Sequence, residues 1–169
     1  MVAKLNSMRL LEQFKVPYEV LLYPDSIKDA EEVAEALGLP YFMVYKTLVV
    51  QSDDTKPGSK PMLVMLASDR RLDLKKMAVA AGQKKVHMAA HKDAEALTGL
   101  KVGGISGLML RDKNWPVYLD QPATALEHIV FSAGQRGTQL RVPVAPLMTV
   151  LRVRLADISS PQDGTPNGE

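Results

Sequence analysis

The apolar residues of this chain change repeatedly between helical spacing and strand alternation, and this constrains its fold most. Helical spacing and helix start signals predict helices near 5–14, 28–37, 74–81, 92–97 and 144–151. Alternating or β-rich runs predict strands at 18–23, 44–50, 62–67, 85–88, 117–119, 129–132 and 139–142. The polar residues 52–61 between two of these strands predict a hairpin turn. The chain is therefore predicted to be a mixed α+β protein.

Length and composition favour one domain. The 169 residues are 46% hydrophobic, which is enough for a single core over residues 1–158. Residues 159–169 are rich in Ser, Pro, Gly, Asn and Asp, so we expect a mobile C-terminal tail there. No apolar run approaches the roughly 18 residues that span a bilayer, and charges are scattered through residues 1–13. These features predict a soluble, cytoplasmic protein with no membrane partner.

The charge is unevenly distributed. The formal net charge is only +2, but residues 70–113 contain ten Lys or Arg against four Asp or Glu. Residues 1–40 contain four against seven. The basic stretch is either an ordinary solvated surface or a weak phosphate-facing patch.

The usual catalytic signatures are absent from the sequence. There is no HExxH, GxSxG, GxGxxG or Walker motif, and the lack of cysteine excludes disulfides, thiolate nucleophiles and sulfur-ligated metals. His87 and His91 have a spacing that would bind a metal on a helix, but they fall at a predicted strand-to-helix junction. His128 is expected at the start of a strand. We predict no metal and no cofactor.

Lys46 lies in the predicted strand Val44-Tyr45-Lys46-Thr47-Leu48-Val49-Val50, which should be buried on at least one face. A lysine there either extends its ammonium to solvent or points it into a pocket to bind a carbonyl, a hydroxyl or a phosphate. Both interpretations remain open from the local sequence.

Two glycine-containing segments have a similar ambiguity. The pair Gly103-Gly104 is either a tight turn or a loop that presents backbone N–H groups to a developing oxyanion. The segment Ser132-Ala133-Gly134-Gln135-Arg136-Gly137, between two predicted strands, allows the same alternatives.

The order and spacing of several segments resemble the YbaK-like aminoacyl-tRNA deacylases, relatives of the editing domain of bacterial prolyl-tRNA synthetases. The resemblance rests on these segments: the Leu10-Leu11 helix, Tyr23, Val44-Tyr45-Lys46-Thr47-Leu48, Leu72-Asp73-Leu74-Lys75-Lys76, Lys84-Lys85-Val86, Thr98-Gly99, Val102-Gly103-Gly104-Ile105-Ser106 and Gly134-Gln135-Arg136-Gly137. It implies a mixed, curved, barrel-like sheet with flanking helices.

The resemblance also implies a function. The family hydrolyses the ester of a mischarged tRNA in trans, with chemistry thought to be assisted by the substrate. Its partners would be the 3'-terminal aminoacyl-adenosine and acceptor stem of that tRNA, with prolyl-tRNA synthetase as a candidate partner. Lys46 matches the family's essential lysine. The expected substrate-binding residues are Tyr23, Thr47, Gly103, Gly104, Ile105, Ser132 and Gly134.

Four positions depart from the cysteinyl-specific members that the chain resembles. This chain has Gly107 in place of proline, Ala133 in place of glycine, Gln135 in place of lysine and Gln139 in place of aspartate. We therefore expect a substrate that is cysteinyl, alanyl, seryl or threonyl tRNA, with tRNA(Pro) the leading carrier. The alternatives are a non-catalytic module that binds aminoacyl-adenosine, nucleotide or tRNA, and a structural domain.

Overall fold

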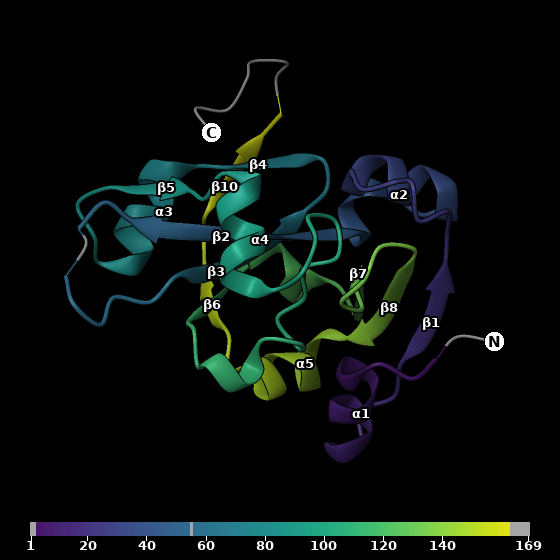
Figure 1. The fold of residues 1–169 in the computed structure, drawn as a ribbon. Coiled ribbons are helices and arrows are strands. Elements are labelled where there is room, and N and C mark those ends of the chain that lie inside the picture. Colours follow the sequence, from purple (N-terminus) through teal and green to yellow (C-terminus); the bar gives the residue numbers. More distant parts are fainter. Residues whose placement is uncertain (1–2, 55, 163–169) are drawn as a thin grey trace.

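The computed structural model describes residues 3–54 and 56–162, and it confirms the mixed α+β architecture (Figure 1). The helices are α1 (Asn6–Gln13), α2 (Ala30–Leu37), α3 (Leu74–Ala81), α4 (His91–Thr98) and α5 (Val144–Leu151), with short 3-10 helices η1 (Tyr41–Met43), η2 (Arg111–Lys113) and η3 (Gln121–Ala125). The strands are β1 (Glu19–Leu22), β2 (Tyr45–Ser52), β3 (Met62–Ala67), β4 (Arg70–Leu72), β5 (Val86–Met88), β6 (Val117–Asp120), β7 (His128–Ser132), β8 (Thr138–Pro143), β9 (Arg154–Ala156) and β10 (Ser159–Pro161). Within the described ranges, no helix has the length and apolar character that crossing a membrane requires.

The strands form three sheets. The largest has the order β5-β2-β3-β6-β9, in which β2 runs antiparallel to β3 and β5, while β3, β6 and β9 are parallel. A second, antiparallel sheet has the order β1-β8-β7, and β10 pairs with β4. A bridge between Val44 and Val130 joins the first two sheets. Over the described residues the sheets do not close, so the barrel-like form expected from the resemblance is not seen.

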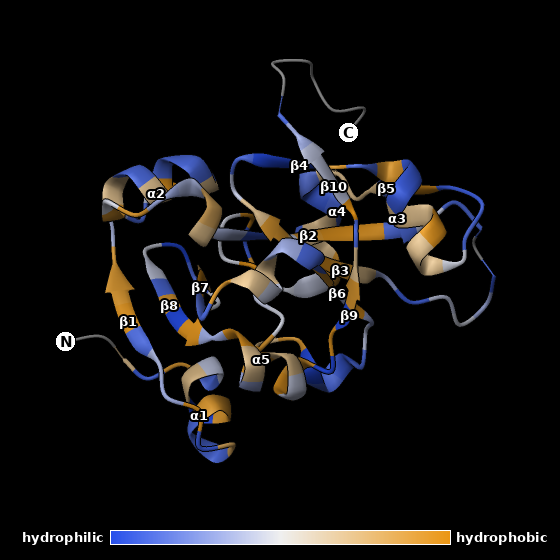
Figure 2. Ribbon diagram, turned by 180° about the vertical axis from the view of Figure 1, so that it is seen from behind, coloured by the Kyte–Doolittle hydropathy of each residue, from blue (hydrophilic) through white to orange (hydrophobic). Residues whose placement is uncertain are grey.

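The hydrophobic core is built around β3, whose six residues are all buried. Side chains that alternate along the neighbouring strand β2 contribute to both of its faces. Tyr45 and Val49 join the larger core cluster, and Val50 joins a second cluster beneath α3. In Figure 2 the middle part of β2 is coloured as hydrophobic. The strand that carries Lys46 therefore contributes side chains to core clusters on both of its faces.

The helix boundaries follow signals that are visible in the sequence. The Asp73 carboxylate accepts hydrogen bonds from the Lys75 and Lys76 amides, both at 3.1 Å, and so caps the N-terminus of α3. Gly82 ends this helix with a left-handed φ of 68°. The predicted helix at 144–151 and strand at 62–67 have the predicted bounds, and the predicted hairpin forms from β2 and β3.

The C-terminal prediction needs a correction. We expected a mobile tail from residue 159, but Ser159–Pro161 form β10 and pair with Leu72, Arg71 and Arg70 of β4. The tail prediction used composition alone, which gives no information on pairing with a distant strand. Residues 163–169, the remainder of the predicted tail, lie outside the described residues.

Candidate active site

A pocket of about 380 Å³ lies along an edge of β2, and we call it the β2-edge pocket. Strand β5 pairs with this edge only from Val50 to Ser52, so among the described residues the first four residues of β2 have no paired strand there. The start of α2, the start of α4, the loop at 102–105 and the strands β7 and β8 supply the other walls. The pocket is thus assembled from segments distant in sequence.

The strand edge itself presents backbone groups to this pocket. The Val44 carbonyl accepts from the Ser68 amide on the β3 side, whereas the Val49 carbonyl accepts from the Ala89 amide on the opposite side. Backbone groups of successive residues point alternately to the two sides of a strand. The N–H and C=O of Thr47 therefore face the β2-edge pocket.

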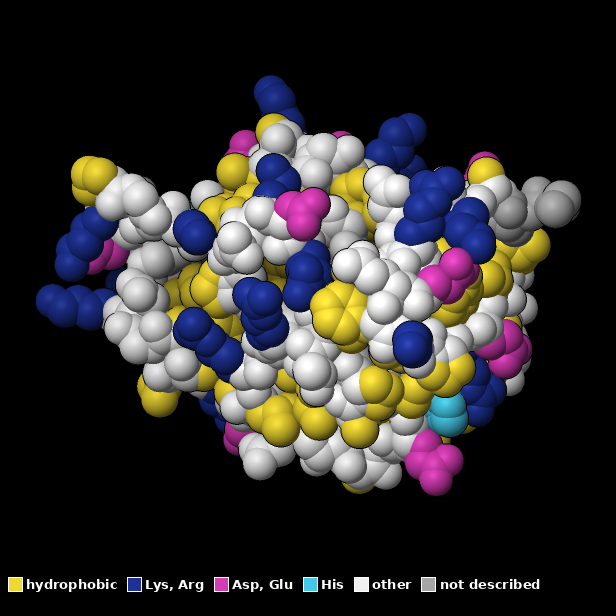
Figure 3. All heavy atoms as spheres, turned by 90° about the horizontal axis from the view of Figure 1, so that it is seen from below, with side chains coloured by type: hydrophobic (Ala, Val, Ile, Leu, Met, Phe, Trp, Pro, Cys, Tyr) yellow, Lys and Arg dark blue, Asp and Glu magenta, His cyan; other side chains and the backbone are white. Residues whose placement is uncertain are grey.

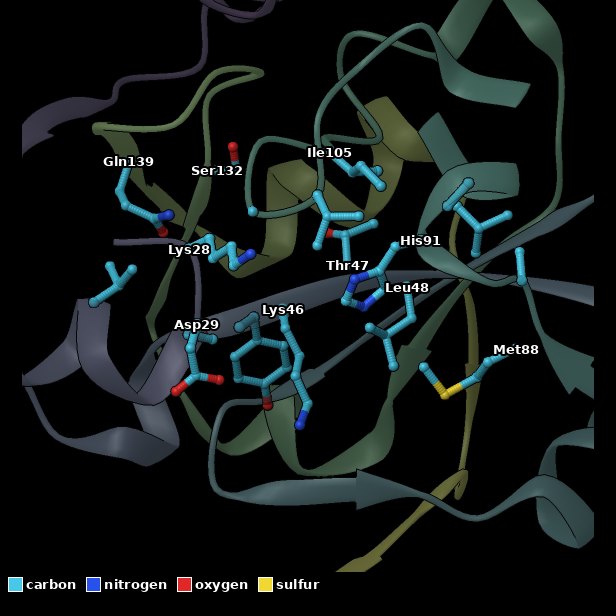
Figure 4. A pocket seen from close by; sticks show the side chains of 18 of the residues that line it. Lys28, Asp29, Lys46, Thr47, Leu48, Met88, His91, Ile105, Ser132 and Gln139 are labelled. Carbon is cyan, nitrogen blue, oxygen red and sulfur yellow. The ribbon is translucent and has the colours of Figure 1, made fainter. Parts of the chain in front are cut away.

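Five predicted site residues line the pocket: Lys46, Thr47, Gly103, Ile105 and Ser132. Figure 4 shows Thr47 near the middle, with Gln139, Ser132 and Lys28 toward one end and His91, Leu48 and Met88 toward the other. Sequence positions 46 and 132 are thus brought together by the fold.

Three predicted site residues lie behind the wall instead of on it. The Tyr23 hydroxyl accepts a hydrogen bond at 3.4 Å from Nε2 of Gln139, which does line the pocket. The Gly134 amide donates to the Ser132 hydroxyl at 3.1 Å. Gly104 also lies behind the lining. Tyr23 and Gly134 thus hold residues that reach the pocket.

Lys46 borders the pocket without directing its ammonium at Thr47. The two neighbouring side chains extend in opposite directions from β2 (Figure 4). The Lys46 ammonium donates to the Ser68 carbonyl at 3.5 Å, which is long for a hydrogen bond. The side chain is half-buried. The local sequence left open whether this lysine reaches solvent or a ligand, and its position at the pocket rim is compatible with both.

Two buried acceptor atoms in the pocket have no hydrogen-bond partner among the described residues. They are Oγ1 of Thr47 and Oε1 of Gln139. Gln139 is only 5% exposed. Leaving such an atom unsatisfied costs about 1–3 kcal/mol. Two of them in one cavity favour a ligand that donates to the Gln139 oxygen and either donates to or accepts from the Thr47 hydroxyl.

The glycine pair shapes the wall by close packing. A Cβ on Gly103 would lie 2.8 Å from the Lys28 Cβ, and φ there is +88°. A Cβ on Gly104 would lie 3.0 Å from the Arg136 amide nitrogen. The Gly104 amide already donates to the Lys101 carbonyl at 2.7 Å. The oxyanion-loop hypothesis is therefore wrong for Gly104 in this arrangement, because its N–H is occupied within its own turn.

Sequence reasoning missed several lining residues. Lys28 and Asp29 line the pocket and directly precede α2. The Asp29 side chain caps this helix by accepting a hydrogen bond from the Glu32 amide at 3.3 Å. An aspartate before a helix is recognisable as a cap from sequence, but its place in the pocket is not. Tyr45 also lines the pocket, and burial raises the pKa of its hydroxyl above the usual value of 10. Lys28 carried no signal in the sequence.

The histidines are separated by the fold. His91 lines the β2-edge pocket, whereas Nδ1 of His87 hydrogen-bonds Oδ1 of Asp53 at 2.6 Å. His128 begins β7, as predicted. Over the residues that the structure describes, no group of three or more His, Cys, Asp or Glu side chains is arranged to hold a metal ion.

Comparisons with known proteins agree with this geometry. Residues 24–150 match the model of the aminoacyl-tRNA editing domain family. The chain is 36% identical over 159 residues to an Enterococcus faecalis protein named "Putative Cys-tRNA(Pro)/Cys-tRNA(Cys) deacylase EbsC", covering 93% of this chain and 94% of that protein. It is 31% identical over 134 residues to a proline–tRNA ligase of Sulfurihydrogenibium sp., covering 79% of this chain but only 22% of the ligase.

Solved structures share the fold. A crystal structure described as "a putative trans-editing enzyme for prolyl tRNA synthetase" superposes with a TM-score of 0.76 at 22% identity, covering 94% of this chain and 99% of that one. A hypothetical protein superposes with a TM-score of 0.82 at 21% identity, covering 92% and 99%.

Proposed function

The chain belongs to the aminoacyl-tRNA editing domain family, and we propose that it is a trans-acting deacylase that hydrolyses the ester of a mischarged tRNA. The observation that supports this most is the β2-edge pocket with its two buried polar atoms, Thr47 Oγ1 and Gln139 Oε1, that have no hydrogen-bond partner among the described residues. Its volume of about 380 Å³ is in the range of small-molecule sites. We place the 3'-terminal aminoacyl-adenosine there.

The reaction is an ester hydrolysis. A water oxygen attacks the carbonyl carbon, the bond from that carbon to the ribose oxygen breaks, and the ribose oxygen takes up a proton. Free amino acid and tRNA are released. An aminoacyl ester is activated, so positioning and charge stabilisation are the main contributions required of the protein. In our proposal a hydroxyl of the terminal ribose assists the attack, and His91 is dispensable as a base.

We assign Lys46 the role of positioning the substrate through its ammonium. The ammonium lies at the rim of the β2-edge pocket and carries three N–H donors, so it can donate to a carbonyl or phosphate oxygen of the substrate as well as to the Ser68 carbonyl. Loss of a hydrogen bond to a charged group costs about 1.5–3 kcal/mol, which corresponds to roughly a 10- to 150-fold loss in rate.

The test uses tRNA(Pro) mischarged with a small amino acid. We expect Lys46→Ala to lower kcat/KM by this factor, and Lys75→Ala, at an exposed lysine of α3, to leave it unchanged. His91→Gln should retain activity and its pH profile if a ribose hydroxyl assists the reaction. Equal rates for the parent and Lys46→Ala would refute the role of Lys46. Tight, saturable binding without turnover would instead support a non-catalytic binding module.

We locate the substrate preference at Gln139. Four residues differ from the cysteinyl-specific pattern, and one of them, Gln139, lines the β2-edge pocket. Gly107, Ala133 and Gln135 are not among the described residues that line it. Gln135 bonds Thr138 Oγ1 at 3.2 Å, Ala133 is buried in the core, and Gly107 packs against Leu151.

Replacing this amide by a carboxylate tests the assignment. A change in a few lining groups alters a pocket's preference between two amino acids by about 1–3 kcal/mol, or roughly 10- to 200-fold. We expect Gln139→Asp to raise kcat/KM for cysteinyl-tRNA relative to alanyl-tRNA by at least tenfold. Gln135→Lys restores another residue of the cysteinyl-specific pattern outside the pocket and should leave the ratio unchanged. The assignment is wrong if both variants keep the parent ratio.

A further inference from the structure

A second pocket, of about 410 Å³, lies where η2, the end of α5 and β9 meet. Three arginines line it, Arg111, Arg152 and Arg154, together with Trp115, the one tryptophan of the chain. Its remaining lining is mainly apolar. We call it the arginine pocket. On the face seen from below, Lys and Arg side chains gather around exposed hydrophobic side chains near the middle of the molecule (Figure 3).

More positive charge surrounds the three arginines. The Lys113 ammonium lies 5.4 Å from the centre of the Trp115 ring, and the Lys60 ammonium donates to the Asn114 carbonyl at 3.5 Å. No carboxylate belongs to the described lining. Among the described residues, none of the five cations forms an ion pair, although the exposed Asp112 is on η2. Five clustered cations without an anionic partner favour a polyanionic ligand.

Two of the guanidinium groups are held in place by the fold. Arg111 Nε donates to the Val150 carbonyl at 2.9 Å, and its guanidinium lies 5.0 Å from the centre of the Phe14 ring. Arg154 donates to the Tyr118 hydroxyl at 3.2 Å. A guanidinium carries five N–H donors, so several on each arginine stay available to phosphate oxygens. Fixed donors lose less entropy when they bind a ligand.

We propose that the arginine pocket binds the phosphodiester backbone of the tRNA. The proposal rests on the proposed function. One loop connects the two sites, because Gly103 and Ile105 line the β2-edge pocket and Gly107 lines the arginine pocket. In this proposal, a tRNA whose 3' end enters the first pocket has its stem contacted by the second.

This assignment differs from the basic stretch that the sequence suggested. Residues 70–113 extend from β4 through α3, β5 and α4 to η2, so the fold distributes their cations over several elements. On α3, the Lys76 ammonium is already paired with Asp157 at 3.1 Å and bonds the Ser159 carbonyl at 2.9 Å. At η2, Arg111 and Lys113 are joined by Arg152 and Arg154 from outside the stretch.

Binding of uncharged tRNA(Pro) at several salt concentrations tests the proposal. We expect the double variant Arg152→Gln, Arg154→Gln to bind at least tenfold more weakly than the parent at low salt. Its plot of log affinity against log salt should be shallower by about 2, since each lost phosphate contact changes the slope by about 1. Arg152→Lys with Arg154→Lys keeps the charge and should retain most of the salt dependence. Arg111 is left intact because it also holds α5.

A matched pair of exposed lysines provides the control. Lys75→Gln with Lys84→Gln removes the same charge from another surface and should leave affinity and slope near the parent values. The proposal is overturned if the double arginine variant binds like the parent, or if the lysine pair weakens binding equally. Thermal unfolding of each variant shows whether a loss of binding reflects a loss of folding.

A short substrate separates this proposal from the proposed function. An aminoacyl ester of adenosine reaches only the β2-edge pocket, so the double arginine variant should hydrolyse it at the parent rate while losing kcat/KM on full-length tRNA. Equal losses on both substrates would contradict a role in stem binding. If the parent hydrolyses neither substrate, the proposed function fails, and the binding measurement still decides whether the arginine pocket recognises RNA.

Discussion

At the residue scale, the β2-edge pocket combines a cost in stability with a capacity to bind. Thr47 Oγ1 and Gln139 Oε1 are buried without hydrogen-bond partners among the described residues. Such atoms are retained where a ligand completes their hydrogen bonds. Lys46, on the same strand as Thr47, adds a positive charge at the rim.

Thr47→Val tests this balance because valine has nearly the same shape as threonine and lacks the hydroxyl. We expect the variant to be more stable than the parent by about 1 kcal/mol in urea unfolding, because an unsatisfied buried oxygen is removed. We also expect slower deacylation of mischarged tRNA. A variant that is destabilised, or that is equally active, would show that the hydroxyl has another role.

The glycines give a second prediction at this scale. Gly103→Ala introduces a Cβ at 2.8 Å from the Lys28 Cβ and at a φ of +88°, so it should both destabilise the fold and impair deacylation. Gly82→Ala is the matched control, because its φ is +68° and a Cβ there meets nothing within 4 Å. It should cost about 1 kcal/mol in thermal or urea unfolding with normal activity. Equal effects of the two variants on activity would contradict the role of Gly103 in shaping the pocket.

The residues of the site were only partly predictable. Lys46 was recognisable because a lysine in an apolar strand needs a special environment, and Ser132 and Thr47 came from the resemblance. Lys28 and His91 precede or begin helices, and their place in the pocket depends on how α2 and α4 pack. That packing is non-local, so no spacing in the sequence predicts it.

At the element scale, Asp73 connects a helix cap with the C-terminal strand. Its carboxylate caps α3 and accepts from the Ser160 hydroxyl of β10 at 2.8 Å. The hydrogen bond from the Lys76 amide is the main cause that lowers the pKa of Asp73 below its usual 3.8, and the Ser160 hydroxyl adds to it.

The pH dependence of unfolding tests this cap. A carboxylate with a lowered native pKa stabilises the fold above its unfolded pKa, and this contribution is lost as the pH falls through the native value. We expect Asp73→Ala to lower the free energy of unfolding by about 1 kcal/mol at pH 7, with a smaller difference below about pH 4. Asp73→Asn keeps a capping acceptor without a titrating group, so it should lose less at pH 7. A difference between Asp73→Ala and the parent that is independent of pH would contradict the account.

The elements that the sequence predicted are those with several periodic residues. The helices α3 and α5 carry caps and apolar spacing that act locally. The strands β4, β9 and β10 were missed because each has three residues and is defined by a distant partner. Short strands of this kind contain too few residues for alternation to be recognised.

At the scale of the whole molecule, the C-terminal segment closes the fold over a buried carboxylate. Asp120 is 1% exposed, and it accepts hydrogen bonds from the Ile158 amide at 3.2 Å and from the Ser159 hydroxyl. We expect a chain that stops after residue 158 to unfold at a clearly lower urea concentration than one that stops after residue 162. The physical reason is that a buried charge would lose a partner. Equal midpoints would restore the domain boundary that we predicted from composition.

The two proposals assign different parts of the tRNA to the two pockets, and both assignments can be tested on the same set of variants. In the two proposals, the β2-edge pocket receives the aminoacyl end of the tRNA, and the arginine pocket receives its phosphate backbone. Substitutions in the first should change turnover and amino acid preference, whereas substitutions in the second should change tRNA affinity and its salt dependence.

The most direct test of the central claim is the release of labelled amino acid from cysteinyl-, alanyl-, seryl- and threonyl-tRNA(Pro) by the parent protein. Lys46→Ala, measured in parallel, controls for contaminating hydrolases. We predict release from at least one of the four well above its spontaneous rate, with a marked decrease for Lys46→Ala. Spontaneous rates for all four substrates would contradict the claim that this chain is an aminoacyl-tRNA deacylase acting on small amino acids.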